Sequence, residues 1–80
     1  MSRMSARFIG QKVGLSTSGV YELWEAMGLV FKDRLGYWDL TDFGRANGGR
    51  LSNGRVPVPT FDFDSIVKMM VEYWEKIHEQ

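Results

Sequence analysis

A run of small hydroxylated side chains is the part of this sequence best suited to binding a polar ligand. Ser16, Thr17 and Ser18 are consecutive, and Tyr21 and Glu22 follow within the next helical turn. Serine and threonine hydroxyls bind phosphate oxygens and base edges. A tyrosine ring can contact a thymine methyl group, and a glutamate can accept from the cytosine amino group. These five residues are therefore candidates for contacts with DNA bases.

Basic side chains elsewhere in the chain are candidates for contacts with DNA phosphates. They are Arg7, Lys12, Lys32, Arg34, Arg50 and Arg55. The formal net charge is zero, but residues 1–55 contain eight basic and five acidic residues, whereas residues 56–80 contain two and five. This distribution predicts a polarised molecule whose basic side includes the hydroxyl run.

Catalytic and metal chemistry have less support in the sequence. The chain has no cysteine and one histidine, His78, which excludes disulfides and a zinc site of nitrogen and sulfur ligands. Helix caps and surface charges explain Asp39, Asp42, Asp62 and Asp64 more economically than a magnesium cluster does. No nucleophile–base pair, phosphate-binding loop or paired-carboxylate motif is visible. We therefore expect no enzyme activity, catalytic residue, metal or cofactor.

The same composition favours a cytoplasmic protein that does not enter a membrane. A chain without cysteine suits a reducing compartment. No uncharged hydrophobic run approaches the roughly 18 residues that a membrane span needs.

Two helices joined by a tight turn are predicted to position the hydroxyl run. Ile9 and Val13 are four residues apart and share one face of a first helix, which begins after Ser5. Gly10 is small enough for a second helix to cross close by, and Gly14 can take the left-handed conformation that the turn requires. The second helix is predicted over residues 17–27, with Ser16 or Thr17 as its cap and Gly28 after its end.

A hairpin and a short helix are predicted next. Residues 29–31 and 37–40 have the pattern of two short strands, and the connecting residues 32–36 include a glycine. Alternation predicts that Phe31 and Trp38 point inward. Thr41 is predicted to cap a helix that ends near Asn47. The positions of other aromatic residues in the helical repeat put them on the apolar faces. The residues predicted in the core on this basis are Phe8, Trp24 and Phe43.

The remaining segments are predicted as an arm, a loop and a final helix. Residues 1–4 form a loose arm, residues 48–55 an exposed loop and residues 56–59 an extended segment, because each proline restricts its own backbone and that of its predecessor. Asp64 is predicted to cap a helix over residues 65–79. Its apolar stripe is wider than one packing interface needs. It therefore suggests a homodimer interface at Met70, Tyr73, Trp74 and Ile77.

These elements predict one α+β domain over residues 1–80 that is mostly α-helical. The order helix, turn, helix, hairpin and short helix is that of a winged helix, here over residues 5–47. A loop and extended segment over residues 48–63 and a carboxy-terminal helix over residues 64–79 are added to it.

The chain resembles winged helix-turn-helix proteins, most closely the carboxy-terminal DNA-binding domains of phage antirepressors. The similarity covers roughly residues 5–47. The residues that carry it are Phe8-Ile9-Gly10, Val13-Gly14-Leu15-Ser16, Leu23, Met27-Gly28-Leu29 and Tyr37-Trp38-Asp39-Leu40-Thr41-Asp42-Phe43-Gly44-Arg45. The resemblance implies that the second helix enters the major groove of double-stranded DNA and that the hairpin contacts phosphates. Antirepressors also carry an amino-terminal effector domain, so the resemblance does not imply antirepressor activity itself.

Two functions are consistent with these features. The first is a small phage or prophage DNA-binding protein that regulates transcription. The second is a protein-binding winged-helix module, a phage factor that binds and modulates a host protein. Glu22 and Glu25 favour the second, because carboxylates repel phosphates and the predicted helix has no arginine or lysine to bind guanine.

Overall fold

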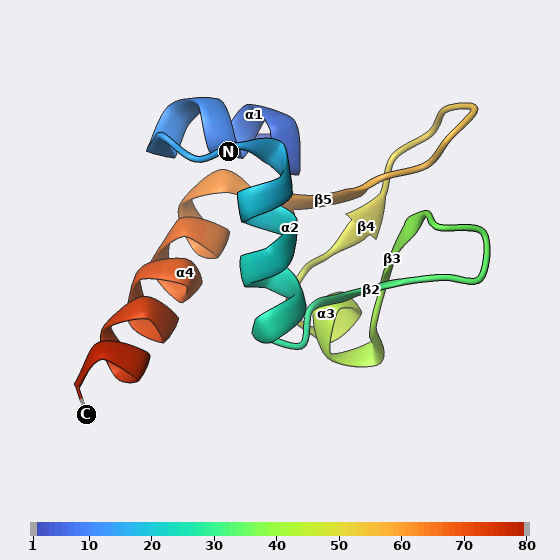
Figure 1. The fold of residues 1–80 in the computed structure, drawn as a ribbon. Coiled ribbons are helices and arrows are strands. Elements are labelled where there is room, and N and C mark those ends of the chain that lie inside the picture. The colour runs from blue at the N-terminus through green and yellow to red at the C-terminus, as the bar shows by residue number, and fades with distance from the viewer. Residues whose placement is uncertain (1, 80) are drawn as a thin grey trace.

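Four helices and five short strands lie within residues 2–79, the part of the chain that this computed structural model describes (Figure 1). The helices are α1 (Ala6–Val13), α2 (Thr17–Ala26), α3 (Asp42–Ala46) and α4 (Phe63–His78). The strands are β1 (Arg3–Ser5), β2 (Val30–Lys32), β3 (Trp38–Leu40), β4 (Arg50–Leu51) and β5 (Pro59–Asp62). The predicted α+β class is confirmed, and helices take up roughly half of the chain.

Glycines set the turn between α1 and α2 as predicted. Gly14 ends α1 with a φ of 78°, and the next amide, that of Leu15, donates to the carbonyl oxygen of Gly10 at 2.9 Å. A Cβ atom at Gly10 would lie 2.5 Å from the Leu15 carbonyl oxygen, so only glycine allows this close approach. Ser16 then caps α2, because its Oγ accepts from the Gly19 amide at 2.9 Å. Gly28 follows α2 with a φ of 80°.

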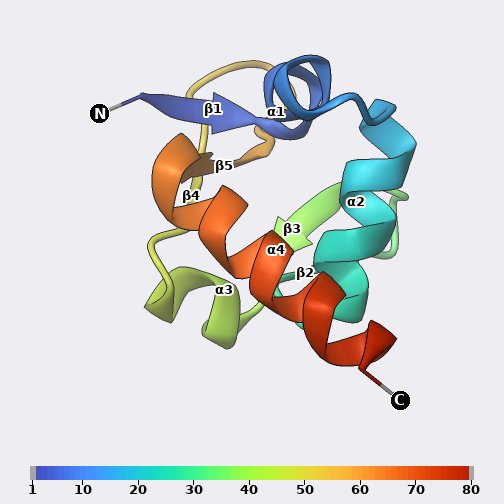
Figure 2. The same cartoon turned by 90° about the vertical axis from the view of Figure 1, so that its left-hand side faces the viewer.

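The core lies where α1, α2, β5 and α4 meet. Trp24 of α2 is fully buried, and its ring meets that of Phe61 edge to face, with centroids 4.9 Å apart. Ile9 of α1 and Ile66 of α4 are also fully buried beside them. In Figure 2, α4 lies across one face of the body, and no other element covers its outer side.

The first strand corrects the prediction of a loose amino-terminal arm. β1 pairs antiparallel with β5, so that Arg3 lies opposite Asp62 and Ser5 opposite Thr60. The Arg3 guanidinium donates to the Gly48 carbonyl oxygen at 2.8 Å and to the Thr60 carbonyl oxygen at 3.0 Å. The prediction was wrong because the pairing partner of this short segment lies at the other end of the chain.

The segment after α3 is a second hairpin rather than an exposed loop. β4 pairs with β5, with Arg50 opposite Thr60. Beyond the strands, the Ser52 amide donates to the Val58 carbonyl oxygen at 2.9 Å, and the Val58 amide donates to Ser52 Oγ at 3.1 Å. Residues 53–57 between them are exposed.

The β2–β3 hairpin is confirmed, and Trp38 of β3 packs against the core as predicted, but the inward face of β2 differs from the prediction. Val30 pairs with Leu40, and both side chains are buried. Phe31 therefore points to the other face and is 42% exposed. Phe8 and Phe43 were also predicted in the core and are 53% and 54% exposed. The predictions for these three phenylalanines were wrong because strand register and helix phase depend on packing partners.

The two later helices begin at capped positions. Thr41 Oγ1 accepts from the Gly44 amide at 2.9 Å and starts α3 as predicted. α4 begins earlier than predicted, because Asp62 and not Asp64 is its cap, accepting from the Ser65 amide at 3.2 Å. Within residues 2–79, no helix has the length and apolar character needed to cross a membrane.

Candidate nucleic-acid interface

The amino-terminal end of α2 presents the hydroxyl run to solvent. Ser16, Thr17 and Ser18 are all exposed. Ser16 Oγ accepts the capping hydrogen bond, which leaves its own proton available to donate. Among the described residues, Thr17 and Ser18 make no side-chain hydrogen bond. The first turn of α2 also points amide groups at this surface, where the helix dipole favours an anion.

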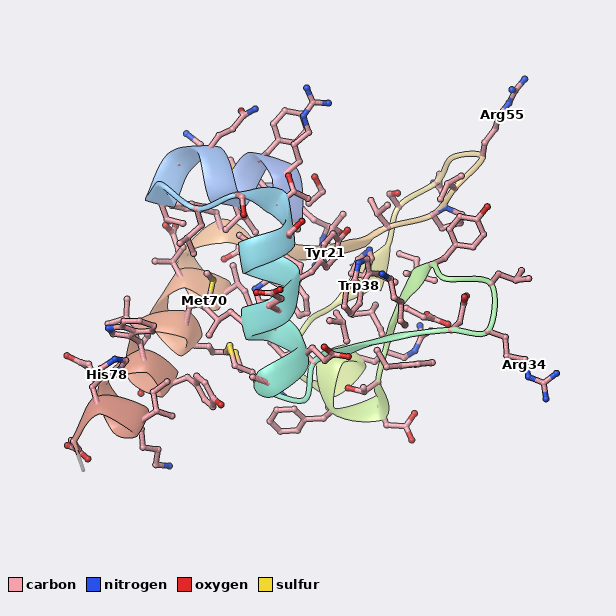
Figure 3. All side chains as sticks on the ribbon, in the orientation of Figure 1. Tyr21, Arg34, Trp38, Arg55, Met70 and His78 are labelled. Atoms are coloured by element: carbon pink, nitrogen blue, oxygen red, sulfur yellow. The ribbon has the colours of Figure 1, made fainter. Side chains whose placement is uncertain are left out.

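Tyr21 does not belong to the exposed surface. Its side chain is 8% exposed, lies parallel to the Trp38 ring with centroids 4.8 Å apart and meets Trp24 edge to face at 5.9 Å. Burial raises the pKa of the Tyr21 hydroxyl above its ordinary value of 10.0. The prediction that Tyr21 faces outward is wrong, because the β2–β3 hairpin packs against that side of α2 (Figure 3).

Glutamates occupy the rest of the outward face of α2. Glu22 and Glu25 are both exposed. The ion pair found within residues 2–79 joins Arg45 and Asp39 at 3.5 Å and involves neither glutamate. The exposed face therefore combines hydroxyl donors at the start of the helix with two carboxylates further along.

The loop of the β2–β3 hairpin is ordered by one aspartate. Asp33 Oδ1 accepts from the amides of Leu35 and Tyr37, both at 2.9 Å, and Gly36 completes the turn with a φ of 86°. Figure 3 places Arg34 at the tip of this loop. A backbone held in this way presents the arginine at a defined position.

Trp38 ties this hairpin to α2. One ring contact is the stack with Tyr21, and another is with the Lys32 ammonium group, 5.3 Å from the centroid of the Trp38 ring. Lys32 is therefore held near the helix that carries the hydroxyl run, whereas Arg34 lies at the outer tip of the loop, away from α2. Both basic residues were predicted from the sequence, but the stack between Tyr21 and Trp38 was not.

The β4–β5 hairpin adds a second basic loop on the same side of the body. Arg50 is exposed in β4, and Figure 3 shows Arg55 at the tip of the connecting loop, which extends in the same direction as the loop of Arg34. A hollow of about 180 Å³ lies between the two hairpins. Its lining residues are Asp33, Tyr37, Trp38, Asp39, Leu51, Arg55, Val56 and Pro57.

Two further candidates for phosphate contacts lie in α1 and not in the two hairpins. Arg7 and Lys12 are exposed. The Arg7 guanidinium lies 5.8 Å from the centroid of the Phe8 ring, and the Lys12 ammonium lies 5.8 Å from the centroid of the Phe63 ring at the start of α4. Lys12 is therefore associated with α4 and not with the hairpins.

The candidate dimer residues of α4 divide between the core and the surface. Met70 is 5% exposed and packs in the core, so its assignment to an interface is wrong. Tyr73 is half-buried, whereas Trp74 and Ile77 are 55% and 48% exposed. Only the exposed residues are available to a partner.

An apolar groove with an acidic rim lies on the opposite side of α4 from Trp74. Its volume is about 520 Å³. The residues that line it are Met27, Phe43, Met69, Glu72, Tyr73, Glu75, Lys76 and Glu79. This groove could not be foreseen from the sequence, because its lining residues come from the residue after α2, from α3 and from α4, which are distant in the chain.

Comparison with known proteins finds no matching family model, no matching curated protein and no matching solved structure.

Proposed function

We propose that this chain is a DNA-binding protein of the winged helix-turn-helix type, and a transcriptional regulator of the kind that phages and prophages encode. α2 enters the major groove, and the β2–β3 hairpin acts as the wing that contacts phosphates. One observation supports this proposal. The helix that begins with the exposed hydroxyl run also stacks, through Tyr21, on Trp38 of a hairpin that carries basic residues.

The residues then have distinct roles in the complex. Ser16, Thr17 and Ser18 donate to base edges or to the nearest phosphates, and Glu22 accepts from cytosine amino groups. Tyr21 supports the wing from inside and does not contact DNA.

Phosphate contacts come from both hairpins. Lys32 and Arg34 act from the wing, and Arg50 and Arg55 act from the β4–β5 hairpin. Four phosphate contacts correspond to a slope of about −3.6 in a plot of the logarithm of the binding constant against that of the salt concentration.

The test is fluorescence anisotropy with random duplex DNA over a range of salt concentrations. The double variant Lys32→Ala/Arg34→Ala is expected to lower the magnitude of this slope by about 2. Each lost phosphate contact contributes roughly 1 to the slope. Lys76→Ala, which removes an exposed basic residue of α4, serves as the control and is expected to leave the slope unchanged. Absence of binding by the native chain at about 50 mM salt would exclude the proposal, because non-specific DNA binding persists there.

A protein-binding function is the second candidate, and the groove beside α4 is the observation that favours it. Met27, Phe43 and Met69 provide an apolar floor, and three of the four charged residues at the rim are glutamates. Such a groove suits a segment of a host protein that combines an apolar anchor with basic residues. A host protein retained by the native chain, lost with Phe43→Ala and unaffected by Lys32→Ala/Arg34→Ala would favour this function over DNA binding.

A further inference from the structure

α4 carries two parallel apolar seams, of which the body of the protein covers only one. The first seam consists of Ile66, Met70, Tyr73 and Ile77, and its first two members are buried in the core. The second seam is shifted by one residue and consists of Val67, Val71, Trp74 and His78. Both seams have the four-three-four spacing that pairs one helix with another.

The second seam is exposed along most of its length. Val67 is half-buried, Val71 and Trp74 are 50% and 55% exposed, and His78 is exposed. Figure 3 shows His78 on the side of α4 that points away from α2, whereas Met70 lies on the side toward α2. Single exposed apolar residues are ordinary, but a continuous strip on one helix indicates an interaction surface.

Trp74 is held in place on this strip. Its ring lies against the His78 ring with centroids 4.0 Å apart, and His78 Nδ1 is 2.9 Å from the Trp74 carbonyl oxygen. An ordered tryptophan loses little conformational entropy when a partner covers it, which is typical of residues that dominate interface energies.

Charges beside the second seam identify the partner. Lys68 follows Val67 and Glu75 follows Trp74, so they occupy equivalent positions seven residues apart on the same flank, and both are exposed. When two copies of such a helix pair in antiparallel orientation, equivalent flanks meet. Lys68 of each copy then lies opposite Glu75 of the other, which gives two identical ion pairs related by a two-fold axis.

A parallel pair would not use these charges. In that orientation the flank with Lys68 and Glu75 meets the opposite flank of the second copy, which carries the buried Met70 and the uncharged Ile77. The alternation of charge on the exposed flank is therefore matched in the antiparallel arrangement alone.

We propose that this chain forms a homodimer in which two α4 helices pack antiparallel through Val67, Val71, Trp74 and His78, with Lys68 of each copy facing Glu75 of the other. The interface is isologous and independent of DNA binding. Trp74 packs against Val71 of the second copy, and this contact is made twice.

Sedimentation velocity of the native chain from about 5 to 200 µM tests the association and is expected to show a concentration-dependent dimer, as weak interfaces do in this range. Trp74→Ala is expected to raise the dissociation constant at least about tenfold, as truncation of a central aromatic residue usually does. A native chain that remains monomeric at about 200 µM, or a dimer that Trp74→Ala does not weaken, overturns the proposal.

Charge reversal tests the orientation. Lys68→Glu and Glu75→Lys each turn two attractive pairs into two repulsive ones, so each is expected to weaken the dimer about tenfold at low salt. The double variant Lys68→Glu/Glu75→Lys restores both pairs and is expected to return the dissociation constant to within about threefold of the native value. An equimolar mixture of the two single variants should form a heterodimer in preference to either homodimer.

Two controls separate the interface from effects on folding. Glu72→Lys reverses an exposed charge of α4 away from the second seam and is expected to leave the dimer unchanged. Thermal unfolding followed by circular dichroism should show that every variant remains folded. A dimer that neither single reversal weakens, or that the double variant does not restore, contradicts the antiparallel arrangement.

Discussion

Tyr21 shows how packing changes the role of a single residue. Its position in the sequence suggested a contact with DNA, yet its ring is buried against Trp38 and Trp24. A phenol in this environment is stable as the neutral form, which is why burial raises its pKa. Tyr21 therefore links stability at alkaline pH to the attachment of the hairpin.

Tyr21→Phe is expected to reduce the loss of stability at high pH. The hydroxyl pKa is raised in the folded chain, so the unfolded chain ionises first once the pH exceeds about 10, and the free energy of unfolding falls from there upward. Phenylalanine keeps the ring contacts and cannot ionise. Urea unfolding at pH 8 and at pH 10.5 measures the difference.

Tyr37→Phe is the matched control for this prediction, because Tyr37 is 48% exposed. The control is expected to keep the alkaline loss of the native chain. An equal alkaline loss in Tyr21→Phe and in the native chain would show that Tyr21 does not cause it.

The β2–β3 hairpin depends at the scale of the element on a single acceptor group. Asp33 Oδ1 binds two amides of its own loop, and the strands beyond it contain only three residues each. Two short strands hold a loop weakly without such support. The position of Arg34 therefore depends on a residue that carries the opposite charge.

Asp33→Ala and Asp33→Asn are expected to differ in DNA affinity. Both remove a negative charge near the phosphates, but asparagine keeps the Oδ1 acceptor and alanine does not. Under the proposed function, Asp33→Asn should bind duplex DNA at least as well as the native chain, and Asp33→Ala should bind several-fold more weakly than Asp33→Asn. Faster hydrogen exchange at the Leu35 and Tyr37 amides in the alanine variant should accompany the loss. Equal affinities for the two variants would show that loop order does not matter.

At the scale of the whole molecule, the amino-terminal strand is held by contacts with segments far away in the chain. Arg3 binds carbonyl groups 45 and 57 residues away, one beyond α3 and the other in β5. β5 in turn pairs with both β1 and β4 and leads directly into α4. The amino-terminal strand thus joins the α3 region to the segment that positions α4.

Arg3→Ala is expected to lower the free energy of unfolding by roughly 1–2 kcal/mol, because two carbonyl groups lose a charged donor. Arg7→Ala, at an exposed position without a hydrogen bond among the described residues, is the control and should stay within about 0.5 kcal/mol of the native chain. Urea denaturation at pH 7 measures both. A cost no larger than that of the control would show that β1 does not stabilise the fold.

Local sequence signals predicted much of the secondary structure and part of the candidate site. Gly10 and Gly14 indicated the turn between α1 and α2, and Thr41 indicated the start of α3, because caps and left-handed residues act within a few positions of the chain. The exposure of Ser16–Ser18 followed from the same local reasoning.

Long-range packing settled what these signals left open. The pairing of β1 with β5, the burial of Tyr21 and the exposure of Phe8, Phe31 and Phe43 all depend on residues far away in the chain. A helix or strand pattern specifies which side chains share a face, but not which face meets another element. That choice depends on the total apolar area that the assembled elements bury. This area is a property of the whole fold and cannot be calculated from any short segment.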